Sequence, residues 1–167
     1  MKRTLFIAAA LVLAGLLLAC TTKMNRHEGT QATQTERISL NPGGPHAGSW
    51  QDDNLVVDYQ YTLEPDIFRI QGTVSLTRRL TGTFNTVQNF SVRANLLTDD
   101  GTIVRSLAIV VVGNSVIRQW RFSQTTGAPP AVTAMIFSYN GRATEGGARL
   151  GGVRRDNGVS TSFWRRP

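Results

Sequence analysis

The stretch LVVDYQYTLEPDIFRIQGTVSL (residues 55–76) contains two runs in which large apolar residues alternate with mostly polar ones. This period of two is typical of β-strands that bury one face. Between the runs, Glu64-Pro65-Asp66 provides the residues of a tight turn. We therefore predict that residues 55–63 and 68–76 form the two strands of an antiparallel hairpin.

Four further segments have strand character and are separated by turn or loop residues. They are residues 87–98, 102–112, 116–122 and 131–139, with turns at Asp99-Asp100-Gly101, at Gly113-Asn114-Ser115 and after Asn140. Because residues 107–112 are apolar on both sides, we expect that strand at the centre of a sheet or beneath a covering segment. Six short strands without a helical period predict one all-β domain over residues 50–141, an immunoglobulin-like antiparallel β-sandwich.

One part of this domain resembles a known family. The pattern Val92-x-Ala-x-Leu96, followed by Asp99-Asp100-Gly101 and an apolar strand, is similar to the FxLYD type of immunoglobulin-like domain. The resemblance implies a module of the cell envelope with a sandwich fold.

The first residues of the chain have the pattern of an export signal. Lys2 and Arg3 precede residues 5–19, which carry no charge. These fifteen residues are fewer than the roughly 20 that a helix needs to cross a membrane. We therefore interpret residues 1–19 as a cleaved signal peptide. An uncleaved anchor helix is the alternative.

Leu17-Leu18-Ala19-Cys20, at the end of this segment, resembles the lipobox of bacterial lipoproteins. The resemblance implies cleavage between Ala19 and Cys20 and a covalent lipid on the Cys20 sulfur, and we expect no other cofactor. Thr21 stands where an Asp commonly retains lipoproteins in the inner membrane, so the resemblance implies an outer-membrane location. We expect the protein to face the periplasm, and an inner-membrane or surface-exposed location is the alternative. The alternative is an ordinary signal peptide with an incidental cysteine.

Residues 20–49 are predicted to form the lipidated cysteine and a flexible tether. Thr, Gln, Asn, Gly and Pro dominate the segment, and no strand or helix period is sustained. Such a composition buries too little apolar surface to offset the entropy lost on ordering. Both histidines, His27 and His46, lie here, so we expect the sandwich itself to contain none.

Residues 142–167 form a basic segment with six arginines and two acidic residues. It is predicted to be either a small hairpin around Asn157-Gly158 or a disordered tail. The candidates for contact with an anionic partner are Arg154, Arg155, Trp164, Arg165 and Arg166. In this compartment the expected partners are lipid headgroups or cell-wall material, rather than nucleic acid. A solvated arginine-rich end is the alternative.

The sequence offers few groups for catalysis. Cys20 is the only cysteine and would be acylated, and no histidine is expected in the domain. We therefore predict no catalytic residue and no metal site. Asp52-Asp53 and Asp99-Asp100 are carboxylate pairs that calcium could use, but neither fits a calcium-loop pattern.

These observations favour a non-catalytic lipoprotein. It would be held to the membrane by its lipid, and its sandwich would bind or scaffold another envelope component, either a protein or cell-wall material. The alternative is a glycan-binding or glycan-hydrolysing envelope protein that uses carboxylates in its loops. A deep pocket with two facing carboxylates would favour this alternative.

Overall fold

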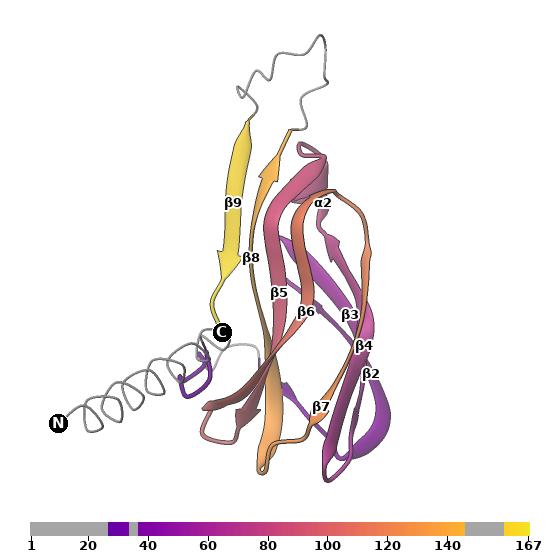
Figure 1. The fold of residues 1–167 in the computed structure, drawn as a ribbon, viewed down its shortest axis with the longest axis vertical. Helices are drawn as coiled ribbons and strands as arrows, with labels where there is room; N and C mark the ends of the chain where they lie inside the picture. Colours follow the sequence, from indigo (N-terminus) through magenta and orange to yellow (C-terminus); the bar gives the residue numbers. More distant parts are fainter. Residues whose placement is uncertain (1–26, 34–36, 146–158) are drawn as a thin grey trace, which may run out of the picture.

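A computed structural model describes residues 27–33, 37–145 and 159–167. They form two antiparallel sheets packed together (Figure 1), so the predicted antiparallel β-sandwich is confirmed. The elements are β1 (Ile38–Ser39), β2 (Gly43–Gln51), β3 (Leu55–Leu63), β4 (Ile67–Leu76), α2 (Arg78–Thr81), β5 (Thr86–Thr98), β6 (Ile103–Val116), β7 (Trp120–Gly127), β8 (Val132–Thr144) and β9 (Ser160–Arg165). Within these described ranges, no helix is long and apolar enough to cross a membrane.

The first sheet has the strand order β2-β3-β4-β7. The predicted hairpin is confirmed, because β3 and β4 pair without a register shift from Leu55↔Leu76 to Leu63↔Phe68. The amide of Glu64 donates to the carbonyl of Ile67 at 2.9 Å and closes the turn. β7 pairs with β4 over residues 120–127. It therefore begins and ends later than the predicted strand at residues 116–122.

The second sheet has the order β1-β8-β5-β6, and β9 also pairs with β8. The predicted turn between β5 and β6 is confirmed, with Gly101 at φ +88°, a conformation that glycine adopts without strain. The predicted turn at residues 113–115 is wrong, because β6 continues to pair with β5 as far as Val116. The central position expected for residues 107–112 is also wrong. β6 is an edge strand, and the Val111 side chain is 72% exposed.

The main core lies between the sheets and is rich in aromatic side chains. Phe68, Phe90 and Phe137 are fully buried. The ring of Trp50 on β2 lies 5.4 Å from that of Phe137, and the ring of Trp120 on β7 lies 4.9 Å from that of Phe90. Strands at both edges of the first sheet therefore contribute tryptophans to the core.

The predicted tether is wrong for residues 43–49, which belong to β2. This strand pairs antiparallel with β3 from Gly43↔Leu63 to Gln51↔Val56. The side chains of β2 show no strand pattern in the sequence. The strand is held instead by backbone hydrogen bonds to the edge of β3 and by the burial of Trp50 near its end. His46 therefore lies in the sandwich, contrary to prediction, with its ring 5.1 Å from that of Tyr61.

The tether prediction is also wrong for residues 27–33, which pack on the second sheet. The amide of Gly29 donates a hydrogen bond to the carbonyl of Ile103 at 2.8 Å. The amide of Ala32 donates one to the carbonyl of Gly101 at 2.9 Å. Ala32 completes a small apolar cluster, separate from the main core, with Leu97, Ile103, Ala134 and Ile136. This cluster lies on part of the outer face of the sheet and explains why the first half of β8 is apolar on both sides.

The C-terminal residues 160–165 form β9, which lies alongside β8 (Figure 1). The register runs from Tyr139↔Arg165 to Thr144↔Ser160, and Phe163 is only 4% exposed. A disordered tail is therefore wrong for this part of the basic segment. The predicted Asn157-Gly158 turn lies outside the described residues.

Candidate functional site

Strand β9 places two of the predicted contact residues, Trp164 and Arg165, on opposite sides of the sheet. Successive side chains of a strand point to opposite faces. Phe163 points inward, with its ring 5.8 Å from that of Phe90, while Trp164 is 64% exposed. Arg165 points inward again, and its guanidinium carbon lies 5.3 Å from the centre of the Trp50 ring.

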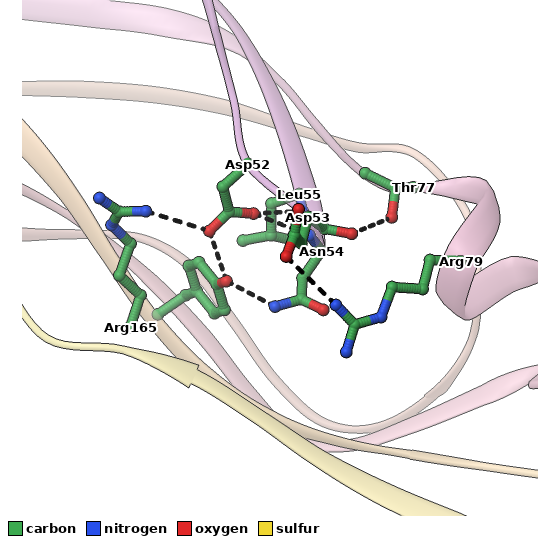
Figure 2. Close-up of polar contacts among 8 residues, drawn as sticks. Asp52, Asp53, Asn54, Leu55, Thr77, Arg79 and Arg165 are labelled. Carbon is green, nitrogen blue, oxygen red and sulfur yellow. Dashed lines mark hydrogen bonds and ion pairs between the residues drawn. The ribbon is translucent and has the colours of Figure 1, made fainter. Parts of the chain in front are cut away.

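Arg165 also belongs to a polar cluster, here called the Asp52 cluster, with Asp52, Asn54 and Tyr139. Asp52 Oδ1 accepts hydrogen bonds from the amides of Asn54 (2.8 Å) and Leu55 (2.9 Å). Its Oδ2 accepts one from the Tyr139 hydroxyl (2.5 Å) and lies 3.5 Å from Arg165 Nη1. Figure 2 shows Asp52 between Arg165 and the turn that begins β3. The cluster therefore joins β8 and β9 of the second sheet to the turn between β2 and β3 of the first.

The electrostatics of this cluster keep the Tyr139 phenol protonated. Burial and, after it, the hydrogen bond to Asp52 raise the pKa of Tyr139 to about 12, while a hydrogen bond from Asn54 acts in the opposite direction. The phenol therefore acts as a hydrogen-bond donor at neutral pH. Asp52 is only 12% exposed in its side chain and is saturated with donors from the protein. The cluster is suited to holding the fold together.

The two carboxylate pairs named as possible calcium ligands, Asp52-Asp53 and Asp99-Asp100, do not form a metal site in the described residues. Asp53 lies 3.4 Å from Arg79 of α2, and its carbonyl accepts from the Thr77 hydroxyl at 2.7 Å (Figure 2). Asp100 accepts from the hydroxyls of Thr98 and Thr102 within the β5–β6 turn, and these bonds lower its pKa to about 2. In the part of the chain that the structure describes, no three His, Cys, Asp or Glu side chains group as metal ligands would.

Trp164 and Arg166 form an exposed pair at the end of β9. The guanidinium carbon of Arg166 lies 5.5 Å from the centre of the Trp164 ring, within the range of a cation–π contact. Trp164 is paired in register with Asn140 on β8. Arg142, two residues further along β8 on the same face, is exposed and donates to the Ser160 hydroxyl at 2.7 Å.

The end of the chain lies beside the N-terminal segment 27–33. The hydroxyl of Thr33 donates to the carbonyl of Pro167 at 3.5 Å, and Figure 1 shows the C-terminus next to the indigo segment. The same segment covers a buried polar network that the sequence did not reveal. Ser106 donates to Asn95 at 2.7 Å, and its amide donates to Glu28 at 3.2 Å.

The described residues line two shallow hollows on the surface of the sandwich. The larger, of about 510 Å³, crosses the outer face of the first sheet above Gly48 and Gly72, between Gln60 and Gln71 on one side and Asp58 and Arg121 on the other. The smaller, of about 420 Å³, lies at the α2 end of the sandwich. Asp58 is the one carboxylate residue lining either hollow, and it accepts from Ser49 at 2.7 Å.

The remaining predicted site residues, Ala19, Cys20, Arg154 and Arg155, lie outside the described residues. Comparison of the chain with protein-family models, with curated proteins and with solved structures gives no match. The lipobox-like sequence and the surface chemistry of the sandwich therefore remain as the indications of function.

Proposed function

We propose that the protein is a lipoprotein of the bacterial cell envelope. It is held by a lipid on Cys20, most readily in the outer membrane, and it presents a non-catalytic sandwich that binds or scaffolds another envelope component. The observation that carries this proposal is the position of Cys20, the single cysteine of the chain, directly after Leu17-Leu18-Ala19 at the end of a signal-length apolar run.

The arrangement of the N-terminal segment supports a sandwich that lies close to the membrane surface. Residues 27–33 pack on the second sheet, so only residues 21–26 separate Cys20 from the described fold. Chain geometry limits the span from Cys20 to His27 to about 25 Å. A lipid on Cys20 would therefore hold the sandwich near the membrane surface, in contrast to the long tether expected from composition.

Glycan binding is a second candidate, supported by the larger hollow. Gln60, Gln71 and Asp58 offer amide and carboxylate groups on its walls, which suit the hydroxyls of a sugar chain. Hydrolysis would need two carboxyl groups flanking one bond, so the single carboxylate of this hollow favours binding. Chemical shifts or calorimetry with soluble peptidoglycan fragments would test it. If the double variant Gln60→Ala/Gln71→Ala shows the same heat of binding as the unaltered protein, the hollow is excluded as the glycan site.

Fractionation of cells tests the main proposal. The full chain should be found in the membrane fraction, and Cys20→Ala should release it into the soluble fraction or leave it as an unprocessed precursor. Ala19→Gly is the matched control, because it keeps a small residue at the cleavage position and should keep the membrane location. A Cys20→Ala chain that is processed and retained like the unaltered protein would refute the lipid anchor.

A further inference from the structure

The outer face of the second sheet carries an exposed aromatic residue beside two exposed arginines. Trp164 is 64% exposed, Arg166 stacks on its ring at 5.5 Å, and Arg142 lies on the neighbouring strand. Tryptophan is enriched where an apolar phase meets water, because its ring is apolar and its N–H is polar. Arginine pairs with phosphate and is attracted to anionic lipid surfaces.

These residues lie on the same face as the segment that leads to Cys20. Ala32 packs against Leu97 and Ile136 on that face, and Thr33 contacts Pro167, three residues after Trp164. Cys20 precedes His27 by seven residues, a reach of at most about 25 Å. The fold thus places the C-terminal end beside Thr33, in the segment whose first described residue, His27, leads to the anchor.

We infer that Trp164, Arg166 and Arg142, here called the Trp164 patch, dock the sandwich on the anionic phospholipid headgroups of the membrane that holds Cys20. This inference rests on the proposed lipid anchor. The ring of Trp164 enters the headgroup region, and the two arginines pair with lipid phosphates. Docking through this face leaves the outer face of the first sheet, with its larger hollow, free to meet a partner.

Tryptophan fluorescence of the lipidated full chain tests the inference directly. The chain is reconstituted in vesicles of phosphatidylcholine and phosphatidylglycerol whose acyl chains are either ordinary or brominated. Trp50 and Trp120 are only 7% and 5% exposed, so quenching by bromine reports mainly on Trp164. We expect a loss of emission in brominated vesicles. Trp164→Ser should remove most of that loss, and Arg142→Ser/Arg166→Ser should reduce it and weaken its dependence on salt.

Arg69→Ser is the matched control. Arg69 is exposed on β4, between the buried Phe68 and Ile70, so the substitution removes an exposed arginine from the outer face of the first sheet, away from the Trp164 patch. Its quenching should equal that of the unaltered chain. If the lipidated chain floats with the vesicles but its emission is the same with and without bromine, the inference is refuted and the anchor stands. If chain purified from membranes carries no lipid on Cys20, the proposed function fails and the inference fails with it.

Discussion

The hydroxyl of Tyr139 on β8 donates a hydrogen bond of 2.5 Å to the carboxylate of Asp52, which follows β2, and so joins the two sheets. The same hydroxyl accepts from Asn54 at 2.8 Å. Tyr139→Phe removes both bonds and leaves two polar side chains without this partner. We expect the free energy of unfolding to fall by about 1–3 kcal/mol in denaturant titrations. Tyr59→Phe is the control, since the Tyr59 hydroxyl makes no hydrogen bond within the described residues. This substitution should lower the free energy of unfolding by less. Equal losses in the two variants would contradict the role given to the Asp52 cluster.

The alternation along β9 predicts opposite outcomes for neighbouring substitutions. Phe163 is 4% exposed and packs near Phe90 and Tyr139, whereas Trp164 is 64% exposed. Phe163→Ala should lower the free energy of unfolding by about 3–5 kcal/mol and speed hydrogen exchange in β9. Trp164→Ala should change stability by less than about 0.5 kcal/mol. A reversed order would show that β9 does not pair with β8 in this register.

Gly72 occupies a position where the sheet leaves no room for a side chain. A Cβ there would lie 2.0 Å from the carbonyl oxygen of Asp58, which is backbone and cannot move aside easily. Gly72→Ala should therefore lower the free energy of unfolding by about 1–3 kcal/mol. At Gly113 a Cβ would meet nothing within 4 Å, so Gly113→Ala serves as the control and should be nearly neutral. Thermal unfolding of both variants measures the difference, and a Gly72→Ala protein as stable as the control would exclude this packing.

The β5–β6 turn should lose stability in acid. Hydrogen bonds from Thr98 and Thr102 lower the pKa of Asp100 from 3.8 to about 2. Because the folded protein binds this proton less readily than the unfolded chain, the stabilisation is complete above pH 4 and is lost as the pH falls toward 2. Asp100→Asn should flatten the dependence of unfolding free energy on pH in this window. Asp99→Asn removes the same charge without those hydrogen bonds. If the Asp100→Asn profile follows that of the unaltered protein, the turn does not depend on the ionised carboxylate.

Local sequence patterns were sufficient to predict the pairing of strands that follow one another in the chain. The alternation in residues 55–76 and the turn at Asp99-Asp100-Gly101 predict hairpins whose partners are adjacent, and both are present. By contrast, β2 contains Gly43, Gly44, Pro45 and Gly48 and shows no hydrophobic period. Its stability comes from pairing with β3, which composition does not reveal.

The candidate site depends on contacts between distant parts of the chain. Arginine and tryptophan in the C-terminal segment indicated an anion-binding end, but the pairing of β9 with β8 decides that Arg165 turns inward and Trp164 outward. Asn95 is polar and alternates with the apolar core residues Ala94 and Leu96 on its strand. It is fully buried because segment 27–33 covers that face, and nothing in the composition of the segment predicted this cover.

The mass of the mature N-terminus tests the central claim most directly. Protein purified from bacterial membranes in detergent would be digested, and the N-terminal peptide measured by mass spectrometry. We predict that it begins at Cys20 and carries the mass of a diacylglycerol on sulfur. A peptide that begins elsewhere, or an unmodified Cys20, would contradict the lipoprotein account.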